Sequence, residues 1–380
     1  MKILIISNIP PFQIGGAEIQ ALGLAERFIA LGHQVCIMGN RITTAVIQHR
    51  DRPLRTVHIP TWAINRLTRA VSYALSLASL LFLYRSQYDI IYCRFVKEAA
   101  LTTGILKWLR VLRVPVVACA ECTGPEGEAA FLSGLPYARF FVWMLNKAMS
   151  AVNIISPAIE QELTALGFDP IKFSRIPNGI AIPRSYKQDL ALAPWYSLVF
   201  VGRITRQKGL SYLLEALREL LHAGTPVRLT IIGAGSDLDK LRHTVKDYEI
   251  ESNVTFLGEI PNERIADYLL AHDIFVLPSL YEGFGVAVVE AMATGLPVIV
   301  TRCGGPEFIV DDTCGRICEP GSIESLTAAI LELMSMSRER LLKMGTSARC
   351  KALATYNMED IAREYIALFQ RCLQTSCSDR

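Results

Sequence analysis

Two glutamates flank a glycine-containing turn in the segment 281–290, whose sequence is YEGFGVAVVE. An apolar run at 273–278 precedes the turn and is typical of a buried strand, and a helix-compatible run begins at Val286. This order directs free backbone N–H groups, and the positive end of a helix dipole, at one point. Such a point binds anions, typically phosphate. We therefore predict an anion site with Glu282 at its mouth and Glu290 placed to accept hydrogen bonds from sugar hydroxyls.

A second segment, 201–209, combines glycines with cations and follows the first expected strand of the second half of the chain. Arginine offers a fork for phosphate oxygens and lysine a point charge. Because Arg203 and Lys208 can reach one anion, we predict that they bind a diphosphate beside the 281–290 site. The alternative is a solvated basic loop, which the flanking glycines disfavour.

Three weaker motifs remain open. Gly15 and Gly16 lie between an expected strand and an expected helix, where they fit either a phosphate or sugar contact or a mere tight turn. The segment 231–238 begins like a dinucleotide fingerprint but lacks the third glycine, so a structural turn is favoured. The C-x-x-C segment 119–122 has no second pair at metal-site spacing, which disfavours zinc or redox chemistry. The glycine-rich 123–128 that follows it fits either a cleft or a solvent loop.

Length and composition bound the class of protein. A chain of 380 residues with 51% hydrophobic and 20% charged residues predicts two folded domains. The start of the chain is too short and too quickly interrupted for a signal peptide, and the ten cysteines show no scaffold pattern, so we expect a cytoplasmic protein with free thiols. The six histidines form no metal-binding pattern.

The net charge of +3 is unevenly distributed, because residues 1–184 hold 19 Lys/Arg against 11 Asp/Glu. Six arginines lie between Arg41 and Arg69, and an apolar stretch follows at 70–84. This combination predicts peripheral contact with an anionic membrane, with an ordinary basic face as the alternative. No nucleic-acid-reading motif accompanies the charge, so nucleic acid is not an expected partner.

Strand and helix patterns alternate through both halves, which predicts two parallel sheets covered on both faces. The helices expected before the best linker candidate, 183–194, are 18–31, 70–84, 98–109, 137–150 and 157–166. Those expected after it are 209–221, 237–248, 263–270, 286–294, 322–334, 337–354 and 358–373. Two such domains would place a cleft at the carboxyl ends of their strands, where the motifs above lie.

In this order the motifs resemble those of the retaining glycosyltransferases of GT-B family 4, over nearly the whole chain. The resemblance is carried by the segments 15–18, 176–179, 202–209, 278–285 and 290–297. It implies an α/β fold of GT-B type, with two Rossmann-like doubly wound domains facing a central cleft. The acceptor-side domain would comprise 1–184 and a C-terminal helix at 358–380, and the nucleotide-sugar-binding domain 185–357.

The resemblance also implies roles for individual residues. Arg203 and Lys208 would bind the donor diphosphate and stabilise the leaving group, and Glu282 would contact the transferred sugar. The implied donor-binding residues are Gly15, Gly16, Gly202, Phe284, Gly285, Val286 and Glu290, the last on the ribose. Many relatives carry a histidine near the start of the loop that follows the expected strand 114–118, and Glu121 is the nearest match to it by position. The other acceptor-side candidates are Glu126, Glu128 and Asn178.

The expected reaction moves a hexose-type sugar, with retention, from a nucleotide-diphosphate-sugar to a glycan or lipid-linked acceptor in polysaccharide or glycoconjugate biosynthesis. No cofactor is expected, and the absence of a D-x-D motif near the cleft turns predicts metal independence. One alternative is a non-catalytic nucleotide-sugar-binding protein of the same fold. A nicotinamide oxidoreductase is a further alternative, which the missing glycine in 231–238 disfavours.

Overall fold

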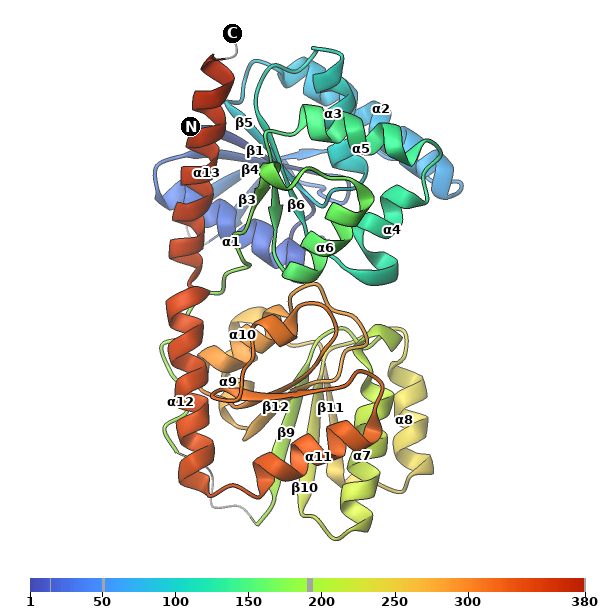
Figure 1. Cartoon of the computed structure of the whole chain (residues 1–380), viewed down its shortest axis with the longest axis vertical. Coiled ribbons are helices and arrows are strands. Elements are labelled where there is room, and N and C mark those ends of the chain that lie inside the picture. Colours follow the sequence, from blue (N-terminus) through green and yellow to red (C-terminus); the bar gives the residue numbers. More distant parts are fainter. Residues whose placement is uncertain (14, 50–51, 190–193, 379–380) are drawn as a thin grey trace. The chain divides into compact units, whose positions relative to one another are not determined.

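The computed structural model describes residues 1–13, 15–49, 52–189 and 194–378. The chain divides into two compact units, of which the first comprises Met1–Gly179 and Met358–Arg380 and the second Ile180–Asn357 (Figure 1). The first unit thus ends at Gly179, whereas the boundary predicted from the sequence was 184. Residues 190–193 of the expected linker lie outside the described residues.

The first unit is built on an eight-stranded sheet with the order β3-β4-β2-β1-β5-β6-β7-β8. Its strands are β1 (Lys2–Ile6), β2 (Gln34–Gly39), β3 (Val46–His49), β4 (Arg52–His58), β5 (Ile90–Arg94), β6 (Val116–Ala120), β7 (Ala151–Ile154) and β8 (Phe173–Ser174). Every pair is parallel except β3 with β4. The central strands β5 and β6 are buried along their whole length, as expected for a parallel sheet covered by helices on both faces.

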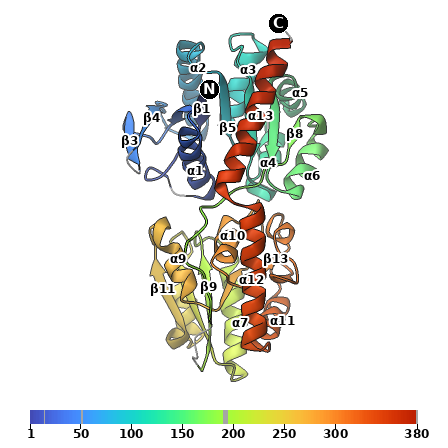
Figure 2. The same ribbon diagram turned by 90° about the vertical axis from the view of Figure 1, so that its left-hand side faces the viewer.

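Seven helices of the first unit pack on this sheet in its described part. They are α1 (Gly16–Ala30), α2 (Arg66–Tyr84), α3 (Glu98–Trp108), α4 (Glu128–Ser133), α5 (Ala138–Ala148), α6 (Pro157–Leu166) and α13 (Met358–Ser378). The C-terminal helix α13 runs along α1, where Phe369 meets Phe28 with ring centroids 5.7 Å apart (Figures 1 and 2). On the other face α3 contacts both α2 and α5. The connection from β1 to β2 steps toward one edge of the sheet, and the connection from β4 to β5 steps toward the other edge. Because both crossovers are right-handed, their helices lie on opposite faces of the sheet.

The second unit contains a six-stranded parallel sheet with the order β11-β10-β9-β12-β13-β14. Its strands are β9 (Tyr196–Val201), β10 (Val227–Ile232), β11 (Val254–Gly258), β12 (Ile274–Leu277), β13 (Val298–Thr301) and β14 (Gly315–Cys318). Its helices are α7 (Leu210–His222), α8 (Leu238–Asp247), α9 (Asn262–Leu270), α10 (Val286–Ala293), α11 (Ile323–Met334) and α12 (Arg338–Thr355). Both units are Rossmann-like, which confirms the predicted α/β fold.

Three elements were not predicted. The edge strand β14 is short and contains glycine and arginine, and it becomes a strand through its pairing with β13. The antiparallel strand β3 likewise depends on β4. The short helix α4 begins at Glu128, the last residue of the glycine-rich segment 123–128, for which a position at the cleft and a solvent loop were both left open. In each case tertiary contacts outweigh a weak local preference.

Candidate active site

Lys208 and Glu282, two of the three predicted catalytic residues, form an ion pair at the carboxyl edge of the second sheet. Their side chains are only 13% and 16% exposed. The two residues follow different strands, β9 and β12, which are neighbours in the sheet. The third, Arg203, is exposed and has no acidic partner among the described residues. Lys208 is therefore paired with a carboxylate, whereas the guanidinium of Arg203, on the same loop, is exposed to solvent.

Backbone hydrogen bonds hold the loops around this ion pair. The N–H of Leu280 donates to the carbonyl of Gln207 at 2.7 Å, and the Gln207 side chain donates to the carbonyl of Tyr281 at 2.9 Å. The N–H of Glu282 donates to the carbonyl of Cys303 at 2.9 Å. The segments after β9, β12 and β13 are thus joined beside Lys208, so the position of the ion pair is set by the sheet and not by a free loop.

Glycines in this region are required by close backbone approach. A Cβ atom on Gly209 would lie 2.0 Å from the carbonyl oxygen of Pro278, and one on Gly233 would lie 1.9 Å from that of Gly202. A Cβ atom on Gly235 would lie 2.2 Å from the carbonyl oxygen of Ile204. The Gly-x-Gly at 233–235 therefore has a packing role against the 202–204 loop, which accounts for it without a dinucleotide.

Helix α10 begins directly after Gly285, whose φ of 92° is in the left-handed region that favours glycine. The first N–H groups of this helix lack intrahelical acceptors and carry the positive end of its dipole. The predicted donor-binding residues Phe284 and Gly285 are buried, and Val286 is half-buried. The structure thus has the strand, turn and helix order that an anion site requires.

Glu290 lies on the second turn of α10 and retains some solvent exposure. Among the described residues nothing donates a hydrogen bond to its carboxylate. Desolvation by the surrounding protein raises the pKa of Glu290 to about 7. An uncompensated carboxylate of this kind is suited to accept hydrogen bonds from hydroxyl groups of a ligand, because ligand donors would then replace the missing water.

We expect Glu290→Gln to remove a pH-dependent loss of stability. Between the ordinary pKa of 4.5 and the native value of about 7, the folded protein binds a proton that the unfolded chain has lost. Stability of the wild type therefore falls as pH rises through this window. In thermal unfolding, the difference in Tm between the variant and the wild type should shift in favour of the variant as the pH is raised from about 5 to about 8. Glu364→Gln, at an exposed position of α13, is the matched control. A Tm difference that stays constant with pH would contradict the prediction.

The first unit has a polar cavity of about 320 Å³ at the carboxyl ends of β1, β2 and β5. Its lining includes Ser7, Asn40, Glu98 and four cations, Arg41, Arg69, Arg94 and Lys97. Arg41 and Arg69 are exposed and have no acidic partner among the described residues. The cavity therefore presents two uncompensated guanidinium groups.

Gly15 and Gly16 lie at the start of α1 in this unit, Gly15 as the N-cap and Gly16 as the first helical residue. Gly16 is exposed, and Gly15 is half-buried. Glu18, in the first turn of the helix, accepts a 2.5 Å hydrogen bond from the side chain of Gln13, and both residues line the cavity. The paired glycines are thus adjacent to the polar cavity, while their predicted contact with a donor stays a prediction.

The acceptor-side candidates divide into buried and exposed groups. Glu121 is buried and paired with the guanidinium of Arg94. Glu128 is fully buried and accepts hydrogen bonds from the N–H groups of Glu121 and Cys122, at 2.8 and 3.0 Å. Desolvation raises the pKa of Glu128 to about 7, although the hydrogen bonds from these N–H groups act to lower it. Both carboxylates thus make internal contacts that stabilise the loop after β6, whereas Glu126 is exposed to solvent.

Asn178, the remaining candidate, is buried. Its neighbour Gly179 exchanges two hydrogen bonds with the side chain of Gln20, at 2.6 and 3.0 Å. Gln20 thereby fixes the end of the first unit to α1. The Gln20 side chain was not identified from the sequence, where it is one polar position in an amphipathic helix.

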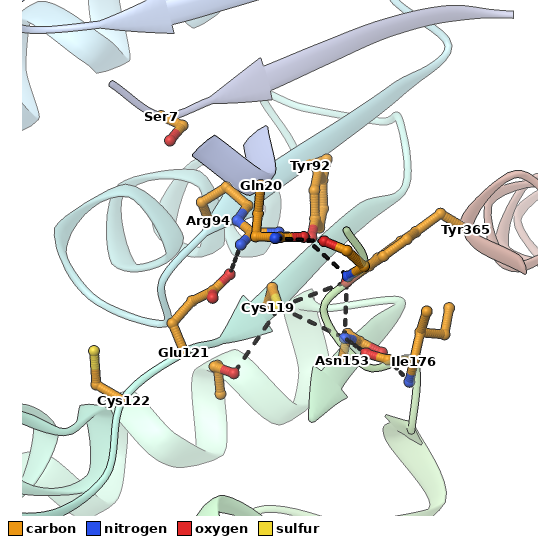
Figure 3. Close-up of polar contacts among 12 residues, drawn as sticks. Ser7, Gln20, Tyr92, Arg94, Cys119, Glu121, Cys122, Asn153, Ile176 and Tyr365 are labelled. Carbon is orange, nitrogen blue, oxygen red and sulfur yellow. Dashed lines mark hydrogen bonds and ion pairs between the residues drawn. The ribbon is translucent and has the colours of Figure 1, made fainter. Parts of the chain in front are cut away.

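A buried polar network continues from Arg94 through the first unit (Figure 3). Arg94 donates to the hydroxyl of Tyr92 at 3.0 Å, while its Nε is buried without a partner among the described residues. Asn153 donates to the hydroxyl of Tyr365 and to the carbonyl of Ile176, both at 2.8 Å. Arg94 and Asn153 were missed in the sequence, although a charged or amide side chain inside an apolar strand was a signal that could have revealed them.

The C-x-x-C motif has no metal-site geometry. Cys119 is fully buried, and burial raises the pKa of its thiol to about 12, which disfavours thiolate chemistry. The nine cysteines whose side chains the structure describes are all free thiols. In the described ranges, no three His, Cys, Asp or Glu side chains are grouped as metal ligands.

Solved structures share this architecture. Sucrose-phosphate synthase from Thermosynechococcus elongatus superposes with a TM-score of 0.82 at 22% identity, covering 98% of this chain and 99% of that one. HepE from Anabaena, solved in complex with UDP-glucose, gives a TM-score of 0.79 at 20% identity, covering 98% of this chain and 100% of that one. The fold is that of the GT-B glycosyltransferases.

Sequence comparison identifies the family. The model for glycosyl transferases group 1 matches residues 191–351, and the model for glycosyltransferase family 4 matches residues 14–184. The two models together match most of the chain, which belongs to the family 4 (group 1) glycosyltransferases of GT-B fold. It is 25% identical to an uncharacterized glycosyltransferase of Methanocaldococcus jannaschii, over 98% of this chain and 99% of the relative. It is 32% identical to the amylovoran biosynthesis glycosyltransferase AmsK of Erwinia amylovora, over 57% of this chain and 52% of the relative.

Proposed function

We propose that this chain transfers a hexose-type sugar, with retention, from a nucleotide-diphosphate-sugar to a glycan or lipid-linked acceptor. The observation that carries the proposal is the Lys208–Glu282 ion pair beside the N-terminus of α10, with Glu290 on the next turn. A cation, free N–H groups and two carboxylates at one sheet edge suit a ligand that combines phosphate with hydroxyl groups. The names of the relatives support the class, because AmsK acts in amylovoran biosynthesis.

The proposed chemistry is electrostatic. The bond between sugar and diphosphate breaks more easily when positive groups stabilise the negative charge that develops on the leaving group. Lys208, Arg203 and the N-terminus of α10 would supply this stabilisation without a divalent metal. Glu290 would hold the ribose hydroxyls and Glu282 the transferred sugar. Retention follows if the acceptor enters on the face that the diphosphate leaves, with the departing phosphate taking the acceptor proton.

The cavity at the carboxyl ends of β1, β2 and β5 is our candidate for the acceptor site. Its uncompensated Arg41 and Arg69 suit an acceptor that carries an anionic group. Glu126 is the acceptor-side carboxylate exposed to solvent. The participation of Glu121 and Glu128 would be indirect, through the shape of the loop that they hold.

A screen of nucleotide sugars tests the proposal. Thermal stabilisation of the full chain should select one base and sugar, and mass spectrometry should then detect release of the nucleoside diphosphate when acceptor glycans are supplied. Stabilisation without release under any acceptor would indicate a non-catalytic nucleotide-sugar-binding protein. No stabilisation by any nucleotide or nucleotide sugar would overturn the proposal.

A further inference from the structure

The helices α2, α3 and α5 leave a large apolar surface open to solvent. On α2 the residues Leu67, Val71, Leu75, Phe82 and Leu83 are each at least half exposed. Four of them, at 67, 71, 75 and 82, fall on one side of the helix at helical spacing. Soluble proteins rarely leave contiguous apolar area of this kind uncovered unless it binds something.

The exposed surface continues with aromatic side chains on α3 and α5. Trp108, Phe140 and Trp143 are each more than 40% exposed and contact one another through Phe140, with ring centroids 5.8 and 5.9 Å apart. Helix α3 contacts both α2 and α5, so these rings belong to the same helical layer as the α2 stripe. Trp62, in the loop before α2, is 71% exposed, and its backbone N–H donates to the hydroxyl of Ser72.

Within this layer, the segments that carry the exposed apolar side chains have charge of one sign, whereas Glu98 lies at the far end of α3. The segments 62–85, 105–113 and 137–147 contain eight Lys/Arg and no Asp or Glu. Among those whose side chains the structure describes, six are exposed: Arg69, Arg85, Arg110, Arg113, Arg139 and Lys147. None of the six has an acidic partner in the described part of the chain. Arg85 lies over the ring of Phe82 at 4.2 Å, so cation and apolar surface are in direct contact.

We propose that this basic and aromatic face, formed by 62–85, 105–113 and 137–147, binds the surface of a bilayer that contains anionic lipids. Apolar and aromatic side chains enter the interfacial region while the surrounding cations contact the lipid phosphates. The proposal concerns a surface of the first unit and does not depend on the proposed transfer reaction.

Helix α2 is long and apolar enough to cross a membrane, but its place in the fold argues for lying on the surface. The segment Leu67–Tyr84 has a mean hydropathy of 1.4, and 11% of it is buried within the protein. Leu77 and Leu81 on its inner side are almost fully buried in the first unit. The helix also connects β4 to β5, two strands of one sheet. A spanning helix would separate these strands by a bilayer and break the sheet.

A second copy of the chain is a poorer partner for this face. A two-fold interface brings the same patch of both subunits together. Six exposed cations would then face six others with no acid between them, which is unfavourable. An anionic lipid surface matches both the charge and the apolar character.

Vesicle binding of the full chain tests the proposal. Phosphatidylcholine vesicles with about 30% phosphatidylglycerol should pull down the protein at low salt, and vesicles of phosphatidylcholine alone should bind it at least about tenfold more weakly. The Leu67→Ser, Leu75→Ser and Phe82→Ser triple variant should lose at least about tenfold in partitioning. A second variant, Arg85→Glu, Arg110→Glu and Arg139→Glu, should also lose binding, and increasing salt should weaken wild-type binding.

Two controls separate the proposal from general stickiness. The substitutions Ile171→Ser, Leu331→Ser and Leu353→Ser remove three exposed apolar side chains elsewhere and should leave binding unchanged. Fluorescence of Trp108 and Trp143 should shift to the blue with anionic vesicles, in a background where Trp62 and Trp195 are phenylalanine. Absence of binding, or equal binding by the wild type and both triple variants, would overturn the proposal. Loss of a dimer, measured by light scattering, in the serine triple variant without any vesicle binding would instead show an interface between copies.

Discussion

Replacing Lys208 with alanine should lower the rate constant for sugar transfer by about two to three orders of magnitude. The proposed role of this cation is to stabilise negative charge on the departing diphosphate, which is larger in the transition state than in the bound donor. The effect should therefore fall on kcat more than on KM. Steady-state assays with the donor selected by the nucleotide-sugar screen measure both constants.

The fold should survive this substitution. Lys208→Ala breaks an ion pair whose side chains are 13% and 16% exposed, so the loss should lie between the about 1 kcal/mol of a surface pair and the about 3–5 kcal/mol of a fully buried one. Arg206→Ala, at an exposed position of the same loop, is the matched control and should retain near wild-type turnover. Lys208→Arg keeps the charge and should recover part of the rate. Turnover by Lys208→Ala within about threefold of wild type would exclude the proposed role.

Replacing Arg94 with alanine should destabilise the first unit by about 3–5 kcal/mol, because it strands the buried carboxylate of Glu121 without its cation. Both side chains are almost entirely shielded from solvent, at 0% and 3% exposure. Urea unfolding followed by tryptophan fluorescence measures the loss. In a Trp195→Phe background the remaining tryptophans all lie in the first unit, so the signal reports that unit alone.

A double variant shows whether the charge or the packing of Arg94 is responsible. Arg94→Leu combined with Glu121→Leu removes both charges and should recover much of the lost stability. Equal losses in Arg94→Ala and in the double variant would mean that the packing of the arginine side chain, and not the ion pair, stabilises this region. A loss below about 1 kcal/mol in Arg94→Ala would mean that water reaches Glu121 in solution.

Most of the fold was predictable because it depends on local patterns. Short apolar runs such as 274–277 must be covered on both sides, and amphipathic runs such as 210–222 supply the cover. The elements that were missed, β3, β14 and α4, have weak local patterns, and neighbouring strands or side chains decide their structure.

The partners that Arg94 and its neighbours contact could not have been predicted from the sequence alone. The guanidinium on β5 meets a carboxylate after β6, and Tyr92 meets side chains of α13 far along the chain. The resemblance to the family made Glu121 the nearest match by position to a histidine that many relatives carry. Only the structure shows that its carboxylate is buried against Arg94, because pairing across strands sets which side chains share an interior.

By itself, the sequence determined the alternating elements, the glycine turns before helices and the chemical types available at the edges of two sheets, since these depend on residues near each other in the chain. The tertiary structure alone decided that Lys208 and Glu282, which follow different strands, form one ion pair. It also decided that Glu290 loses part of its hydration and that Glu121 and Glu128 are internal. Solvent exposure and charge pairing are properties of the packed chain, because residues distant in sequence displace the water that would otherwise solvate each group.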